Sequence, residues 1–342
     1  MHMLVPAEVL FAGEMPPPVM PVVDHYAGTE TRMRKALALQ RETGPLFDIT
    51  CDCEDGAPAG AEAEHAHLCA ELILGAENRH GRVGARIHDI THPHWERDLE
   101  ILVGTAGKRL AFVTLPKVRS ANDAARQIAA LRALESRHGL VRPIPAHVLI
   151  ETHGALREIW QISALENVEC LDFGIMDFIS AHHGAIPASA MRSPDQFEHP
   201  LIVRAKCEIA AAALAFGRVP AHNVTTELSN TDAVYQDARL ARKFGFLRMW
   251  SIHPNQIDPI LKAMRPDFSE TETAIAILTA AQEAGWGPIR HAGKLHDRAS
   301  FRYYWTLLQR AHATGVLLAE DESVQRFGLA TPEFSRSRPV WR

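Results

Sequence analysis

The stretch from Pro145 to Asp177, PAHVLIETHGALREIWQISALENVECLDFGIMD, decides the fold of the chain. Two apolar runs flank a helical pattern at about residues 155–165, and an acid follows each run, Glu151 after the first and Asp177 after the second. This order predicts a strand, a helix and a second, parallel strand. Because the carboxyl ends of parallel strands share one face, we expect Glu151 and Asp177 to converge.

Two converging carboxylates can hold a hard divalent cation. Mg²⁺ prefers oxygen ligands and keeps several of its waters, so Glu151 and Asp177 could bind it together. The alternative is that each acid only caps the helix that follows its strand. From these two residues alone, both interpretations stay open.

The same alternation of apolar runs and helical patterns continues along most of the chain. Each of eight runs is followed by a helical pattern, and the runs cover residues 19–23, 46–58, 82–89, 110–118, 148–150, 170–173, 219–226 and 246–254. Eight such units over roughly 240 residues predict an α/β fold, a (β/α)₈ TIM barrel. A doubly wound open sheet is the alternative, but it usually has fewer strands, and no G-x-G-x-x-G follows a strand here.

The composition of the chain is ordinary for a globular protein. The 342 residues are 46% hydrophobic and carry a net charge of -5, which predicts no general affinity for nucleic acid or for anionic membranes. No apolar run is long enough to span a bilayer, and the N-terminus lacks a signal-peptide pattern. Five cysteines form no disulfide framework, and we interpret Cys51 and Cys53 as reduced packing residues. We therefore expect a cytoplasmic protein.

Two domains are predicted. Residues 1–264 would form the barrel, with residues 1–18 as an N-terminal lead, and residues 265–342 would form a C-terminal helical extension. In that extension, a loop with Gly285, Gly287 and Gly293 separates two helical patterns, whose apolar faces must pack on the barrel or on a neighbouring subunit. We interpret the extension as a lid that excludes water from the site, with a plain surface loop as the alternative.

The barrel prediction locates the active site, because active sites of this fold lie at the carboxyl ends of the strands. The polar residues expected there are Asp52, Glu54, Asp55, Arg86, Lys117, Glu151, Asp177 and His253. Some of them have structural alternatives. Asp55 could cap a turn, Lys117 could only pair with an acid, and His253 is better explained as a satisfied buried histidine.

Seven motifs resemble those of one family. They are CDCEDGAP, VGARIHD, FVTLPKV, VLIETHGAL, LDFGIMDF, GFLRMWSIHPNQI and GKLHDRAS, in order from about residue 46 to residue 300. Together they are similar to the citrate lyase β-subunit-like proteins of the HpcH/HpaI aldolase/citrate lyase superfamily. The chain departs from the family pattern at His88, where Asn is usual, at Arg248-Met249, where Gly-Lys is usual, and at His222-Asn223, near a usual Asp.

The resemblance implies a Mg²⁺-dependent carbon–carbon lyase acting on a β-hydroxyacyl thioester such as malyl-CoA or citramalyl-CoA. It implies Mg²⁺ on Glu151 and Asp177, and Arg86 as the catalytic group that polarises the reacting oxygen. Supporting groups would hold metal-bound waters and orient Arg86; these are Asp52, Glu54 and Asp55.

The resemblance also implies how the substrate is held and how the site closes. Backbone N–H groups at Gly174, Ile175 and Met176 would bind the substrate carboxylate. Asp297 would serve in acid–base catalysis from a neighbouring subunit, in a homotrimer or hexamer.

Two other functions remain open at this point. One is an aldolase that uses the same metal on free 2-keto-hydroxy acids and has no CoA pocket. The other is a non-catalytic, citrate-lyase-like binding subunit. Basic residues such as Arg32, Arg34 and Lys35 could contact a CoA phosphate, although a solvated helix face is the simpler interpretation. The sequence does not choose the acyl group, its carrier or the number of subunits.

Overall fold

The computed structural model describes residues 4–11, 18–318 and 320–329. By its internal contacts the chain forms two compact units. One unit comprises residues 22–264, and the other combines residues 1–21 with residues 265–342. Each unit is described by itself.

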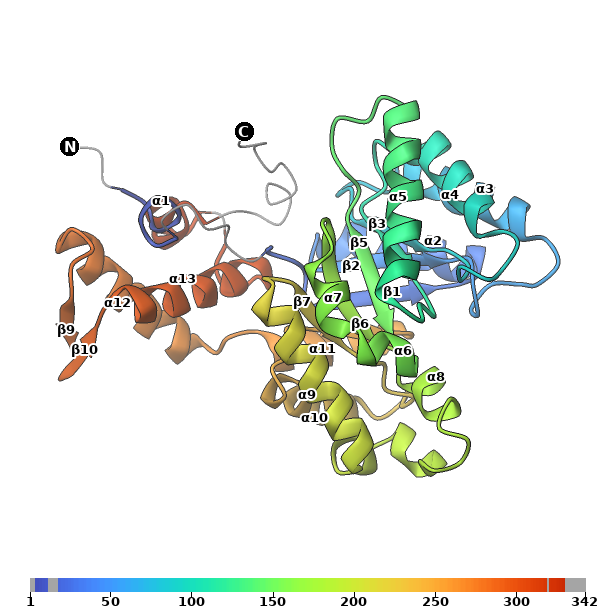
Figure 1. The fold of residues 1–342 in the computed structure, drawn as a ribbon. Coiled ribbons are helices and arrows are strands. Elements are labelled where there is room, and N and C mark those ends of the chain that lie inside the picture. Colours follow the sequence, from blue (N-terminus) through green and yellow to red (C-terminus); the bar gives the residue numbers. More distant parts are fainter. Residues whose placement is uncertain (1–3, 12–17, 319, 330–342) are drawn as a thin grey trace. The chain divides into compact units, whose positions relative to one another are not determined.

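The larger unit is a closed barrel. Within the described residues, eight parallel strands pair in sequence order and the last closes on the first. They are β1 (Val23–Ala27), β2 (Phe47–Asp52), β3 (Val83–Arg86), β4 (Val113–Leu115), β5 (Ala146–Ile150), β6 (Val168–Phe173), β7 (Val219–His222) and β8 (Arg248–Ser251) (Figure 1). The predicted (β/α)₈ TIM barrel is confirmed.

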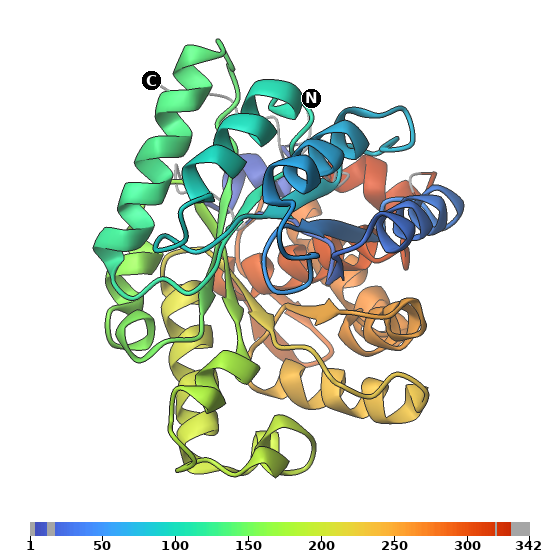
Figure 2. The same ribbon diagram turned by 90° about the vertical axis from the view of Figure 1, so that its right-hand side faces the viewer.

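Helices surround these strands (Figure 2). They are α2 (Glu30–Thr43), α3 (Glu62–Leu74), α4 (Trp95–Ala106), α5 (Ala121–Arg137), α6 (His153–Arg157), α7 (Ile159–Ala164), α8 (Ile175–Ser180), α9 (Pro200–Ala215), α10 (Thr231–Lys243) and α11 (Ile257–Met264). Between the strands and this layer lies a continuous apolar core. Short 3₁₀ turns lie at η1 (Ala188–Met191), η2 (Asp195–Phe197) and η3 (Pro254–Gln256).

Two local predictions were wrong. The first strand was expected at residues 19–23 but begins at Val23, because Pro21 has no N–H for a ladder and the polar residues after Val23 have partners inside the barrel. One such partner is Thr50, whose hydroxyl donates to Asp24 Oδ1 at 2.7 Å. The single helix expected after Glu151 is instead two short helices, α6 and α7, that break at Glu158.

The barrel interior contains an ionic layer near the amino ends of the strands. Arg248 is fully buried and forms ion pairs with Asp24 Oδ2 at 2.8 Å and Asp48 Oδ2 at 2.7 Å. The side chain of Arg82 binds Asp48 Oδ1 at 3.0 Å from the other side. Arg248, a departure from the family pattern in the sequence, therefore belongs to the barrel core rather than to its mouth.

The smaller unit has its own apolar core. Its elements are α1 (Pro6–Val9), α12 (Phe268–Glu283), the antiparallel hairpin of β9 (Ile289–His291) and β10 (Lys294–His296), α13 (Arg298–Ala313) and α14 (Glu322–Phe327). Core residues include Leu10, Leu278, Phe301, Trp305 and Phe327. The hairpin occupies part of the loop expected between the two helices. Among the described residues of both units, no helix has the length and apolarity needed to cross a membrane.

The N-terminal lead belongs to this smaller unit. Phe11 packs edge-on against Trp305 with ring centroids 5.3 Å apart, and Arg302 Nε donates to Leu10 O at 2.6 Å. We expected the lead to be part of the barrel domain and expected the C-terminal helices to need an outside surface. Both expectations were wrong for the same reason. Leu10 and Phe11 of the lead pack with α12, α13 and α14, so the apolar faces of these helices are buried within the smaller unit.

The ionic layer gives a stability prediction. Arg248→Met would leave Asp24 and Asp48 without this cation in a fully buried position, so we expect a loss of about 3–5 kcal/mol in the free energy of unfolding. Arg204→Met is the matched control, because Arg204 pairs with Glu208 on an exposed helix face and should change stability by less than about 0.5 kcal/mol. Urea denaturation measures both; equal effects would show that the Arg248 layer contributes little.

Candidate active site

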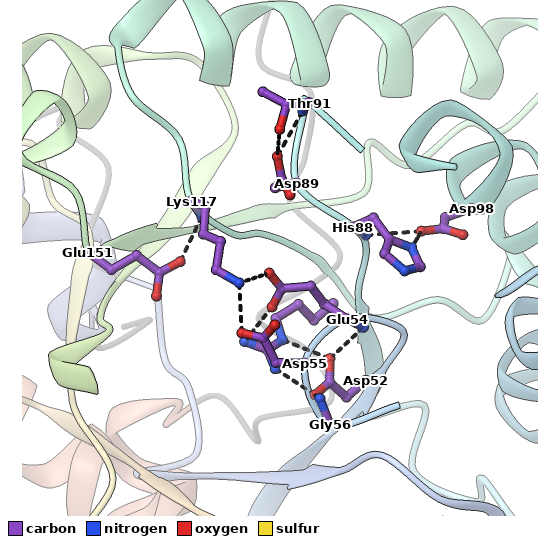
Figure 3. Close-up of polar contacts among 11 residues, drawn as sticks. Asp52, Glu54, Asp55, Gly56, His88, Asp89, Thr91, Asp98, Lys117 and Glu151 are labelled. Atoms are coloured by element: carbon purple, nitrogen blue, oxygen red, sulfur yellow. Dashed lines mark hydrogen bonds and ion pairs between the residues drawn. The ribbon is translucent and has the colours of Figure 1, made fainter. Parts of the chain in front are cut away.

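Polar side chains from consecutive strands meet at the carboxyl end of the barrel. Each ends or follows its strand, and they are Asp52 and Glu54 at β2, Arg86 at β3, Lys117 after β4 and Glu151 after β5. Figure 3 shows Asp52, Glu54, Lys117 and Glu151 in close-up. Ion pairs and hydrogen bonds connect them into one network, so the structure brings these sequence-predicted residues together.

Arg86 is held in a fixed orientation by two acids. Its Nε and Nη2 donate to Asp52 Oδ1 and Oδ2 at 2.7 and 2.5 Å, and Nη1 forms an ion pair with Glu54 Oε2 at 2.9 Å. Burial alone would lower the pKa of Arg86, but the charges of Asp52 and Glu54 hold it above its ordinary value. Burial opposes ionisation of Asp52 as well, and Arg86 outweighs it and lowers the pKa of Asp52. The pair stays charged across the physiological range.

An aromatic stack lies next to Arg86, and it was not expected from the sequence. The guanidinium lies 5.4 Å from the ring centroid of Tyr26, which stacks on Trp250 at 4.0 Å. Both rings are buried, and a cation over an aromatic face is attracted to it. The signal was present only as aromatic residues near the ends of the first and last strands, which a closed barrel makes neighbours.

Lys117 connects the Arg86 cluster to Glu151. Its Nζ donates to Glu54 Oε1 at 2.5 Å and Asp55 Oδ2 at 2.7 Å, while its backbone N–H donates to Glu151 Oε1 at 2.7 Å. Its φ of 48° is unusual for a residue other than glycine, which marks a backbone held by its surroundings. Asp55 was expected to orient Arg86; it pairs with Lys117 instead, with a side chain 57% exposed, because it lies beyond the end of the strand.

Glu151 is a buried carboxylate beside the half-buried Asp177. Burial, and then the charge of Asp177, raise the pKa of Glu151 to about 8, so the two carboxyls lie within electrostatic range of each other. A Cβ at Gly174 would lie 2.1 Å from Glu151 Oε2, so only glycine leaves room for this carboxylate. Glu151 does not cap α6, because Thr152 does so by accepting from Ala155 N.

These residues fit a bound divalent cation. Five carboxylates (Asp52, Glu54, Asp55, Glu151 and Asp177) share the barrel mouth with two cationic side chains, those of Arg86 and Lys117. Both cations are already paired with Asp52, Glu54 and Asp55. Within residues 4–11, 18–318 and 320–329, neither Glu151 nor Asp177 forms an ion pair with a cationic side chain. Their oxygens are the ligand type that Mg²⁺ prefers.

The turn into α8 offers backbone N–H groups. The N–H of Gly174 donates to Ile150 O at 3.3 Å and so belongs to the barrel ladder. The N–H groups of Ile175 and Met176 open the helix and have no acceptor within it. Three residues were expected to bind a substrate carboxylate through their N–H groups. The N–H of Gly174 is already used, and this residue instead leaves room for Glu151 because it has no side chain.

Other candidate residues have structural roles. Asp297 lies in the smaller unit, where it caps α13 by accepting from Ala299 N at 3.0 Å. His253 is half-buried and caps η3. Arg34 pairs with Glu30 on the exposed face of α2, in line with a solvated helix face. A role for Asp297 in chemistry stays a prediction.

His88, which stands where the family pattern usually has Asn, forms a hydrogen bond with a buried carboxylate. Asp98 Oδ2 accepts from the backbone N of His88 at 2.9 Å and lies 2.6 Å from His88 Nδ1. Burial would lower the pKa of His88, but this bond and the charge of Asp98 raise it. Asp98 lies on α4, ten residues along the chain, and sequence spacing gave no indication of this pair.

Comparisons with known proteins agree with this geometry. The model of the HpcH/HpaI aldolase/citrate lyase family matches residues 48–254. The L-malyl-CoA/beta-methylmalyl-CoA lyase of Cereibacter sphaeroides is 25% identical over 275 residues, which cover 77% of this chain and 86% of that protein. The citrate lyase subunit beta-like protein of Mycobacterium tuberculosis is 27% identical over 263 residues, 77% of this chain and 87% of that one.

Solved structures give the same result. A crystal structure of a citrate lyase from Burkholderia xenovorans is 51% identical, has a TM-score of 0.82, and the match covers 95% of this chain and 99% of that one. A Mycobacterium tuberculosis protein in complex with magnesium, acetoacetate and coenzyme A is 24% identical with a TM-score of 0.64, covering 86% and 98%, and shares the fold.

Glu151 gives a pH-dependent prediction. Its pKa is raised from 4.5 to about 8 in the folded metal-free protein, so its stabilising contribution is full below pH 4.5 and is lost as the pH rises through 8. Glu151→Gln keeps an acceptor for Lys117 N but cannot ionise. Relative to this variant, the metal-free wild type should lose up to about 1.4 kcal/mol per pH unit over that range.

Urea denaturation with a chelator, repeated at each pH, measures the difference. Added Mg²⁺ should restore the stability of the wild type at pH 8 and leave Glu151→Gln unchanged. Parallel pH profiles of the two proteins would mean that the Glu151 carboxylate is not buried as described.

Proposed function

Because this chain belongs to the HpcH/HpaI aldolase/citrate lyase family, we propose that it is a Mg²⁺-dependent carbon–carbon lyase. Its substrate would be a β-hydroxyacyl-CoA such as malyl-CoA or citramalyl-CoA, cleaved or formed through an enolate. The observation that carries the proposal is the placement of Arg86, fixed by Asp52 and Glu54, in the same barrel mouth as the buried carboxylate of Glu151.

Glu151 and Asp177 would hold the metal. When bound, Mg²⁺ supplies a Lewis acid and a template for the oxygens of the acid fragment. Lys117 N–H fixes the orientation of Glu151 by its bond to Oε1, and Gly174 leaves space beside Oε2. The N–H groups of Ile175 and Met176 would bind the substrate carboxylate.

Arg86 would stabilise the charge that develops on the reacting oxygen. A guanidinium has five N–H donors, and three are used by Asp52 and Glu54, which leaves two for the substrate. Because its partners hold it in place before the substrate arrives, little reorganisation is needed during the reaction. The fixed carboxylates also keep the guanidinium charged.

The choice of a CoA thioester rests on the relatives. The Cereibacter sphaeroides relative is named for malyl-CoA, and a protein of the same fold binds coenzyme A together with magnesium and acetoacetate. An aldolase acting on free 2-keto-hydroxy acids would use the same residues at the metal and at Arg86.

A substrate panel tests the function. Purified protein with Mg²⁺ would be offered malyl-type CoA thioesters and free hydroxy-keto acids, and release of the 2-keto acid and of the acyl-CoA would be followed. We expect turnover of CoA thioesters that stops when Mg²⁺ is chelated. Turnover of free acids alone, or ligand binding without any turnover, would contradict the proposal.

Arg86→Lys gives the next prediction. Lysine keeps the charge but loses the planar fork that binds Asp52 through two atoms, so we expect kcat to fall by about 10²–10³ with the fold intact. Arg204→Lys, an exposed exchange of the same type, is the control and should keep normal kcat. A near-normal kcat for Arg86→Lys would limit Arg86 to a structural role.

Asp297 can be tested for action between subunits. Asparagine is also a good N-cap, so Asp297→Asn should leave α13 intact while removing the carboxylate. We propose that Asp297 serves a neighbouring subunit of a homo-oligomer. Mixing Asp297→Asn with Glu151→Gln under subunit exchange should then restore part of the activity, because some mixed sites contain both native residues.

As a control, differently tagged subunits show whether the two variants exchange subunits. If exchange is complete and activity remains at the level of the separate variants, Asp297 does not act in trans.

A further inference from the structure

A group of thiols and one imidazole lies between β2 and α3, apart from the residues that would bind Mg²⁺. Cys53 directly follows β2, and its neighbours in sequence are Asp52 and Glu54. Because side chains alternate along an extended chain, Cys53 points away from these two acids. His65 and Cys69 lie four residues apart on α3 and therefore share one helix face.

The ligand atoms of these three residues are already close together. Cys53 Sγ lies 3.7 Å from Cys69 Sγ, and both sulfurs and a ring nitrogen of His65 lie within 4.8 Å of one another. A tetrahedral zinc ion has Zn–S bonds of about 2.3 Å, which places two sulfur ligands about 3.8 Å apart. The observed separation of the sulfurs thus equals one edge of such a site.

His65 has the partner that metal-bound histidines usually have. Its Nε2 lies 2.9 Å from the backbone O of Asp52. When Nε2–H donates this bond, Nδ1 carries the lone pair, and a hydrogen bond of this kind fixes the ring of a metal ligand. The same bond joins the cluster to Asp52, the residue that holds Arg86.

The surroundings are dry and contain no disulfide. Cys53, Cys69 and His65 are all buried, and the cysteines are free thiols. Metal binding would release the thiol protons to solvent, as it does in thiolate sites generally.

We propose that Cys53, Cys69 and His65 bind one thiophilic divalent cation of the zinc class. Sulfur and imidazole ligands favour such an ion, whereas the carboxylates at the barrel mouth favour Mg²⁺, so the two sites select different metals. The ion would fasten the first half of α3 to the end of β2. It would thereby fix the segment from which Asp52 and Glu54 hold Arg86.

Cobalt substitution tests the site in the full-length protein. Metal-depleted protein, kept reduced and saturated with Mg²⁺, would be titrated with Co²⁺. We expect one equivalent to bind with a sulfur-to-cobalt charge-transfer band and the strong visible absorption of tetrahedral Co²⁺. Weak, octahedral-type absorption alone would overturn the proposal, because it is the signature of an oxygen site.

Variants identify the ligands. Cys53→Ala and Cys69→Ala should each weaken Co²⁺ binding and reduce the intensity of the charge-transfer band, with circular dichroism confirming the fold. Two controls should keep it: Cys207→Ala, at an exposed position, and Cys170→Ala, in the other cysteine-containing group inside the barrel with His147 and Asp172. An undiminished band and unchanged Co²⁺ affinity in both ligand variants, or loss of the band with Cys170→Ala, contradicts the assignment.

A measurement on the wild type avoids any dependence on variant folding. X-ray absorption of the protein loaded with Zn²⁺ should show sulfur scatterers at about 2.3 Å. A shell of oxygen and nitrogen only would overturn the site. Mg²⁺-dependent lyase activity is assayed separately, so failure of this site and failure of the proposed function are distinguishable.

Discussion

The two-point bond between Asp52 and Arg86 is the interaction on which the site depends. The register of β2 and β3 places these two residues opposite each other, so the pairing of these adjacent strands brings the two side chains together. From Arg86, contacts continue through Glu54 and Lys117 to Glu151, and they cross the ends of four consecutive strands. A slip of one residue in β2 would turn Asp52 away from Arg86 and break this network at its first contact.

The barrel buries carboxylates near both ends of its strands, and the cost of burying their charge is offset in different ways. Near the amino ends of the strands, Arg248 and Arg82 neutralise Asp24 and Asp48 inside the barrel. At the mouth, burial and the charge of Asp177 outweigh the charge of Arg86 and raise the pKa of Glu151 to about 8. The first arrangement completes a core. The second leaves a buried carboxylate that a metal ion can use, which is why we assign function to the mouth alone.

Much of the barrel could be predicted from the sequence because most of its strands are apolar runs that a local helical pattern follows. The acids and Arg86 could be found because strand ends share one face. What could not be predicted depends on contacts between distant residues. Tyr26 meets Trp250 only through barrel closure, Asp98 meets His88 from a helix face, and the N-terminal lead packs on helices near the other end of the chain.

We propose that the barrel mouth binds Mg²⁺ through Glu151 and Asp177. Calorimetric titration of Mg²⁺ into the wild type, Glu151→Gln and Asp177→Asn tests this binding site. We expect one site in the wild type and little or no binding in either variant, with all three proteins equally folded. Unchanged Mg²⁺ affinity in both variants would contradict it.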